Sequence, residues 1–160
     1  MKMRALVIVF VSLLSLGVAS AAKLEDPRTG RSVTVEPGAP ALHVVFFATW
    51  CSTCVEELPG LADLEARWKG QGYELALIAV RTRHDVERLK EFVNEERPPG
   101  RLLFDADGQA EASWKASRLP THVVFDAAGR EVSRSSRLDD GIRNAIADLL
   151  DTRRGKGRPR

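Results

Sequence analysis

Two runs of consecutive apolar residues, separated by one amphipathic segment, constrain most strongly what this chain can fold into. His43–Phe47 and Leu75–Val80 are continuous enough to be strands buried on both faces of a sheet. Between them, large apolar residues recur every three or four positions, as on the inner face of a helix: Leu58, Leu61, Leu64 and Trp68. Since strand–helix–strand connections cross over right-handedly, the two strands should be parallel and adjacent or nearly so.

The remaining segments complete a small α/β fold with a second, antiparallel half. In order, we expect two short extended pieces within Lys23–Val35, a helix carrying Val86, Leu89 and Val93, a strand at Leu102–Phe104, a helix at Gln109–Ala116, paired strands at Thr121–Phe125 and Glu131–Arg134, and a last helix facing inward through Ile142, Ile146 and Leu149. The first helix should run from the Cys51–Cys54 segment to about Lys69, with a kink at Pro59. This order predicts a three-layer sandwich, a mixed central sheet with helices on both faces.

The chain has room for one globular domain of ordinary composition. It has 160 residues, of which 44% are hydrophobic, and its two cysteines exclude a disulfide scaffold. We expect a targeting segment at 1–22, the folded domain at 23–150 and a basic, disordered tail at 151–160. The targeting segment joins Lys2 and Arg4 to the apolar run Ala5–Val18 and the small residues Ala19–Ala22. This pattern fits a signal peptide cleaved near Ala22 or an uncleaved membrane anchor, and both place the domain outside the cytoplasm.

The charge balance does not indicate the basic surface that a nucleic-acid-binding domain needs. The chain has 24 basic and 22 acidic residues, and removing residues 1–22 deletes Lys2 and Arg4, which leaves 22 of each. The tail carries +4, so the body carries −4. We therefore expect no nucleic-acid partner.

Cys51 and Cys54 are the residues with the clearest chemistry. They stand between a buried strand and a helix, where free N–H groups lower the pKa of the first thiol and a second thiol one turn later resolves a mixed disulfide. A structural disulfide this short would remove little entropy from the unfolded chain. A zinc site would need more ligands than the scattered His43, His84 and His122 supply. Redox activity is therefore the favoured interpretation.

Two segments resemble one family. Phe46–Pro59 is similar to the active-site segment of the thioredoxin superfamily, and within it to the TlpA/ResA-like extracytoplasmic thiol–disulfide oxidoreductases with their W-C-x-x-C-x-x-E-x-P pattern. Downstream, Leu119–Arg130 is similar to that family's (V/L)-P-T-x-x-x-(I/F)-D-x-x-G segment. The resemblance covers about Leu24 to Leu150 and implies a thioredoxin-like fold.

The resemblance also implies roles for individual residues. Pro120 corresponds to the family's cis-proline, so Leu119, Pro120 and Thr121 would form the edge on which an extended substrate docks. Trp50 would pack beside the dithiol and shield it, or serve as a plain core aromatic. Glu57 matches a glutamate linked to the dithiol's proton chemistry, and partial burial would raise its pKa and let it take the proton of Cys54; a solvated, inert Glu57 is the alternative.

Two positions leave other chemistry open. Thr53 stands where the family usually has proline, so its N–H is a possible further donor to the Cys51 sulfur, which would make the couple more oxidising. His122 follows Pro120 closely and, with Cys51 and Cys54, offers the ligands of a Cu(I) chaperone. The related copper chaperones, however, carry C-x-x-x-C.

The resemblance implies a reductant that exchanges disulfides with protein partners, with Cys51 attacking and Cys54 resolving. A membrane thiol–electron carrier would reduce it, its substrates would include apocytochrome c cysteines, and it would act in the periplasm, tethered or free, as a monomer. An oxidant or isomerase on the same scaffold is the alternative, and the copper chaperone is a third. We expect no organic or metal cofactor, because the cysteine pair is itself the redox group.

Overall fold

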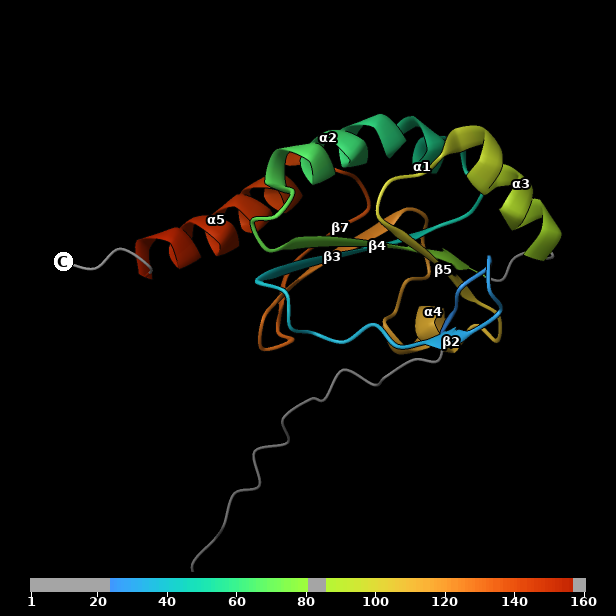
Figure 1. Cartoon of the computed structure of the whole chain (residues 1–160), viewed down its shortest axis with the longest axis horizontal. Coiled ribbons are helices and arrows are strands. Elements are labelled where there is room, and N and C mark those ends of the chain that lie inside the picture. Colours follow the sequence, from blue (N-terminus) through green and yellow to red (C-terminus); the bar gives the residue numbers. More distant parts are fainter. Residues whose placement is uncertain (1–23, 81–85, 157–160) are drawn as a thin grey trace, which may run out of the picture.

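The structure is a computed structural model that describes residues 24–80 and 86–156. Its strands are β1 (Leu24–Glu25), β2 (Ser32–Val33), β3 (Ala41–Phe47), β4 (Tyr73–Val80), β5 (Arg101–Asp105), β6 (Thr121–Asp126) and β7 (Glu131–Ser135). Its helices are α1 (Ser52–Glu56), α2 (Leu58–Trp68), α3 (Val86–Glu96), α4 (Gln109–Ser113) and α5 (Asp140–Lys156). All seven strands form one mixed sheet in the order β2–β1–β5–β4–β3–β6–β7 (Figure 1). The predicted α/β class is confirmed.

Strand β3 lies inside the sheet, between β4 and β6, and all seven of its residues are buried. It pairs in parallel with β4, from Ala41 opposite Tyr73 to Phe47 opposite Ala79, as the crossover rule predicts. On its other edge β6 runs antiparallel, with Phe46 opposite Thr121. The end of β3 and the beginning of β6 therefore lie at the same end of the sheet.

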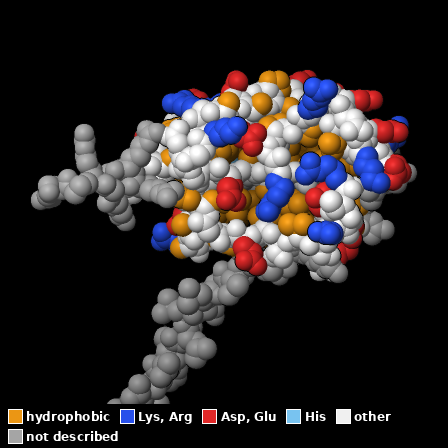
Figure 2. Space-filling view, viewed as in Figure 1, with side chains coloured by type: hydrophobic (Ala, Val, Ile, Leu, Met, Phe, Trp, Pro, Cys, Tyr) orange, Lys and Arg blue, Asp and Glu red, His pale blue; other side chains and the backbone are white. Residues whose placement is uncertain are grey.

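The helices cover the two faces unequally. Figure 1 shows α1, α2, α3 and α5 above the sheet and α4 below it. Alternate side chains of β3 follow this division, since Phe47 packs on Phe92 of α3 and Phe46 packs edge-on against Trp114 at the end of α4. Acidic and basic side chains are interspersed over the surface seen in Figure 2, with apolar patches between them.

The single kinked helix predicted from Cys51 to Lys69 is two helices. Helix α1 ends at Glu56 and α2 begins at Leu58, with Glu57 between them. Pro59, in the first turn of α2, has no N–H with which to continue the first helix, and its ring suits a helix beginning. Glu57 therefore lies at the junction between the two helices.

The C-terminal helix extends further than expected. Helix α5 runs to Lys156 and so includes much of the stretch for which we predicted a disordered tail from residue 151. Its innermost residues are Ile142, Ile146 and Leu150, because a helical repeat of 3.6 residues brings Leu150 to the core and leaves the predicted Leu149 half-buried. The expected targeting segment at 1–22 lies outside the described residues. Within residues 24–80 and 86–156, no helix is long and apolar enough to cross a membrane.

A buried carboxylate anchors the helix on the lower face. Asp105 ends β5 with no exposed surface, and its two oxygens accept the backbone N–H groups of Ala110 and Glu111 at 3.1 and 2.7 Å. These N–H groups belong to the first turn of α4, where no helical carbonyl is available to them. Asp105 thus replaces the side-chain cap that Gly108, at the N-cap, lacks.

We expect Asp105→Ala to lower the free energy of unfolding by about 2 kcal/mol, because it leaves two buried N–H groups without a charged acceptor. Urea unfolding should show a lower midpoint at an unchanged slope. Asp107→Ala is the matched control: Asp107 accepts one N–H, from Gln109, at an exposed position. Equal losses in the two variants would contradict the role assigned to Asp105.

Candidate active site

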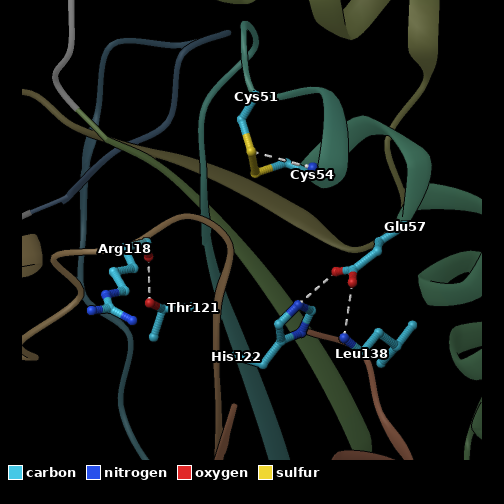
Figure 3. The surroundings of a disulfide bond; sticks show 7 residues. All are labelled: Cys51, Cys54, Glu57, Arg118, Thr121, His122 and Leu138. Carbon is cyan, nitrogen blue, oxygen red and sulfur yellow. Dashed lines mark hydrogen bonds and ion pairs between the residues drawn. A yellow bond between two sulfur atoms is a disulfide. The ribbon is translucent and has the colours of Figure 1, made fainter. Parts of the chain in front are cut away.

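Cys51 and Cys54 form a disulfide with their Cα atoms 5.2 Å apart, at the beginning of α1 (Figure 3). Both residues are buried, Cys51 with 8% and Cys54 with 3% of its surface exposed, so Cys51 is the more exposed residue of the pair. The pair follows the buried end of β3 after a short turn in which Cys51 N–H donates to the Ala48 carbonyl. The predicted arrangement of strand, dithiol and helix is present in the structure.

Cys51 is the N-cap residue of α1. Its backbone is extended, and its sulfur accepts the N–H of Cys54 at 3.3 Å. The same N–H would stabilise a Cys51 thiolate once the disulfide is reduced, since helix-terminal donors favour a negative charge. The N–H of Thr53, considered above as a further donor, makes no hydrogen bond to this sulfur in the described structure.

The ring of Trp50 is 56% exposed, which excludes the alternative of a plain core aromatic. It lines a hollow between the dithiol turn and α3, together with Val55 and Phe92. Acidic side chains of α3 border this hollow: Glu91, Glu95 and Glu96. Trp50 is therefore a surface residue next to the cysteines, available to another molecule.

The peptide bond between Leu119 and Pro120 is cis. Thr121 begins β6 opposite Phe46, and its hydroxyl donates to the carbonyl of Arg118 at 2.5 Å, which closes the turn around the proline. This turn lies in the surroundings of the disulfide in Figure 3. Leu119 is partly buried, and Pro120 and Thr121 are buried. The structure therefore brings the predicted docking edge and the dithiol to one end of the sheet.

The carboxylate of Glu57 points to His122 and to the backbone of Leu138 in Figure 3. One carboxylate oxygen accepts from Nε2 of His122 at 2.8 Å, and the other accepts the backbone N–H of Leu138 at 3.0 Å. Its side chain is 15% exposed. Both oxygens thus have partners far away in the sequence, so Glu57 is not a solvated residue on an outer face.

The predicted direction of the Glu57 pKa shift is also wrong. Burial raises the pKa, as expected, but the hydrogen bonds from His122 and Leu138, with the charge of Arg137, outweigh it. The pKa of Glu57 is therefore lowered from its usual value, and the side chain is a carboxylate at neutral pH. Burial alone was the wrong guide because it ignores the donors that the fold brings to the carboxylate.

Both ring nitrogens of His122 are engaged. Nε2 contacts Glu57, and Nδ1 lies 3.1 Å from Nε2 of His43. Neither nitrogen faces the sulfurs with a free lone pair. Among residues 24–80 and 86–156, no group of three or more metal-ligating side chains is close enough to hold an ion. The geometry gives the copper alternative no support.

Sequence reasoning missed two members of this cluster, His43 and Tyr73. His43 is completely buried in the middle of β3, and its Nδ1 lies 2.9 Å from the Tyr73 hydroxyl. The available signal was the single polar residue within the apolar run Ala41–Phe47, since a histidine inside a buried strand needs partners for its ring nitrogens. The sequence shows that His43 lies within this apolar run, but it does not show which residues its ring nitrogens contact.

Comparison with known proteins agrees with this geometry. Residues 25–131 match the family described as AhpC/TSA. The chain is 26% identical over 109 residues to the thiol-disulfide oxidoreductase ResA of Bacillus subtilis (strain 168), covering 68% of this chain and 60% of the relative. It is 29% identical over 106 residues to ResA of Oceanobacillus iheyensis, covering 65% and 54%. The chain thus spans little more than half the length of these curated relatives.

Among solved structures, a putative thiol:disulfide interchange protein DsbE from Chlorobium tepidum superposes with a TM-score of 0.71 at 19% identity, covering 80% of this chain and 92% of the other. That likeness shows the shared fold, and the family match spans the dithiol, the cis-proline and the strands that join them. The chain belongs to the AhpC/TSA family, and its fold is thioredoxin-like.

Proposed function

We propose that this protein is a thiol–disulfide oxidoreductase that exchanges disulfides with protein partners through Cys51 and Cys54. The observation that carries the proposal is the cysteine pair at the beginning of α1. Cys51 is the more exposed residue of the two, and its sulfur accepts a backbone N–H. The cis-Pro120 turn at the same end of the sheet supports a docking edge formed by Leu119, Pro120 and Thr121. The exposed Trp50, which precedes Cys51 in the chain, supports a docking surface next to the dithiol.

The reaction as a reductant proceeds in two exchanges. The Cys51 thiolate attacks one sulfur of the substrate disulfide, and the other substrate sulfur leaves as a thiolate and takes a proton from solvent. Cys54 then loses its proton and attacks the Cys51 sulfur, which releases the second substrate sulfur as a thiolate, and this too is protonated. The substrate gains two electrons and two protons, and the enzyme ends with the Cys51–Cys54 disulfide seen here.

Glu57 is the candidate acceptor for the Cys54 proton. It follows Cys54 by three residues and is ionised at neutral pH, because the hydrogen bonds from His122 and Leu138 outweigh the effect of burial on its pKa. In the disulfide form, one of its oxygens accepts from His122 and the other from the backbone N–H of Leu138. Taking the proton weakens these hydrogen bonds, because a protonated carboxyl group is a poorer acceptor than a carboxylate.

The resemblance to the ResA-like proteins supports the wider setting. We place the protein outside the cytoplasm, periplasmic or tethered to the inner membrane by its first residues, because a basic beginning and an apolar run precede the domain. There a membrane thiol–electron carrier would re-reduce the disulfide, and cytochrome c maturation would supply substrates. The domain would act as a monomer.

An oxidant or isomerase is the second candidate. The N–H that Cys54 donates to the Cys51 sulfur favours the reduced, thiolate form, and stabilising the reduced form makes a couple more oxidising. The reduction potential of the Cys51–Cys54 couple separates the two. A value near about −270 mV indicates a reductant, and one near about −120 mV indicates an oxidant.

We expect Cys51→Ser and Cys54→Ser each to abolish multiple-turnover disulfide reduction, measured with insulin and a thiol reductant. Cys54→Ser should also accumulate a mixed disulfide between Cys51 and the substrate, because the resolving thiol is gone. Cys51→Ser should form no such adduct through the buried Cys54. Undiminished reduction by either variant would exclude the proposed function.

We expect Glu57→Gln to move the ionisation of Cys54 to lower pH by about one pH unit, because it removes a nearby negative charge that disfavours the thiolate. Turnover should fall about tenfold with the loss of the proton acceptor. Alkylation rates of the reduced protein across pH, together with steady-state turnover, measure both effects. Glu56→Gln is the matched control, because Glu56 is the exposed neighbour. Identical pH profiles for Glu57→Gln and the unmodified protein would remove Glu57 from the mechanism.

A further inference from the structure

Four side chains from separate elements form one continuous hydrogen-bond chain beneath α1 and α2. The Tyr73 hydroxyl of β4 lies 2.9 Å from Nδ1 of His43 on β3, and Nε2 of His43 lies 3.1 Å from Nδ1 of His122 on β6. Nε2 of His122 donates to Glu57 at the α1–α2 junction at 2.8 Å. Both imidazoles are completely buried, and Tyr73 is 9% exposed. The mechanism above uses only the last member of this chain.

The donors in this chain can be assigned from its two ends. The buried Tyr73 hydroxyl must donate its proton, and the acceptor that the structure gives it is Nδ1 of His43. Burial lowers the pKa of His43 well below its usual value, so this ring is neutral and carries its one proton on Nε2. That proton goes to Nδ1 of His122, which leaves Nε2 of His122 to donate to the Glu57 carboxylate. Every donor points toward Glu57.

We propose that Tyr73 and His43 are positioning residues that fix the tautomer of His122 and, through it, hold Glu57 as an oriented carboxylate beside the dithiol. We call this arrangement of Tyr73, His43, His122 and Glu57 the lock. Its importance for turnover rests on the proposed function, whereas the lock itself rests on the three hydrogen bonds and on the burial of the residues that make them.

The lock opposes uptake of a proton by the Glu57–His122 pair. A second proton on His122 would occupy Nδ1 and face the N–H of His43. A proton on the Glu57 oxygen that accepts from His122 would face the N–H of His122. Either conflict is relieved only if His43 moves its own proton to Nδ1, and the buried Tyr73 hydroxyl then loses its acceptor. Proton uptake by the pair therefore costs one buried, unpaired donor.

This hydrogen-bond chain ends at Tyr73, which does not give up its proton, so the four residues do not conduct protons. Passing a proton toward Glu57 would leave a tyrosinate, and burial, aided by Glu65, raises the pKa of Tyr73, with Arg143 opposing. The charged groups that face His122 and Glu57 lie in the β7–α5 connection. Arg137 lowers the pKa of Glu57, and Asp139 interacts with His122. These four neighbours, from α2, α5 and that connection, remain in the variants below.

The first test reads the tautomers directly in the unmodified full chain, in its disulfide form. Nitrogen-15 NMR distinguishes a protonated from an unprotonated ring nitrogen. At pH 7 we expect Nε2 to be protonated and Nδ1 to be unprotonated in both His43 and His122. A proton on Nδ1 of either ring would overturn the proposal. No substitution is needed, so the result does not depend on how a variant folds.

The second test is Tyr73→Phe. A water molecule at the position of the lost hydroxyl can form a hydrogen bond with Nδ1 of His43 in either tautomer, because water both donates and accepts. The bias against proton uptake is then removed, and the apparent pKa of the Glu57–His122 pair should rise by about one pH unit. The carbon-13 shift of the Glu57 carboxyl group, followed across pH in the disulfide form, measures it. An unchanged titration would overturn the lock.

Trp114→Phe is the matched control, because it also removes one polar atom from a buried aromatic ring. The Trp114 indole N–H has no hydrogen-bond partner among the described residues, and the ring packs against Phe46 on the other face of the sheet. It should leave the titration unchanged; an equal shift would show a general effect of aromatic substitution and overturn the lock.

The same variants separate the lock from the proposed function. In the reduced protein, Tyr73→Phe should shift the pH profile of disulfide exchange, and the shift should vanish in the Glu57→Gln background. A shift that persists without the carboxylate would overturn the assigned path through Glu57. Absence of exchange in the unmodified protein would overturn the proposed function while both NMR results stand. A reversed tautomer would overturn the lock while exchange continues.

Discussion

The pairing of β3 on both edges decides where everything else in this molecule lies. Its parallel pairing with β4 requires the crossover that α1 and α2 supply, and that crossover begins with the dithiol. Its antiparallel pairing with β6 puts Thr121 opposite Phe46, so the cis-Pro120 turn reaches the same end of the sheet. Alternation of side chains along β3 then directs His43 into one layer and Phe46 into the other. One strand thus positions the cysteines, the docking edge and the buried polar chain.

Local signals in the sequence were sufficient for the elements and for the dithiol. Continuous apolar runs marked β3 and β4, and two cysteines at a strand–helix boundary marked the site. The division of the first helix at Glu57 was harder to predict, because a proline permits a kink as well as a break. Within α5, the predicted inward-facing residues were wrong by one position at the third of them, because Leu150 and not Leu149 is buried.

The electrostatics of the site could not be predicted from the sequence, for a definite reason. The pKa of Glu57 depends on donors 65 and 81 positions away, His122 and Leu138. Sequence spacing shows that a carboxylate lies near the helix junction, but not which groups the sheet brings to it. The exposure of Trp50 is similar, since apolar character alone does not distinguish a core aromatic from one that faces a partner.

The hydrogen bond from Leu138 to Glu57 has a practical consequence for anyone who rearranges this chain. It is a main-chain contact from the connection that leads into α5, so no side-chain substitution at Leu138 other than proline removes the donor. Opening the chain there, by circular permutation or by inserting a reporter, would detach that donor from the carboxylate. Permuted or tagged versions cut at this connection would carry altered acid–base chemistry even with both sulfurs in place. Engineering is safer at the exposed turn around Gly30. This turn joins β1 and β2, which are separated from β3 by β5 and β4 in the sheet.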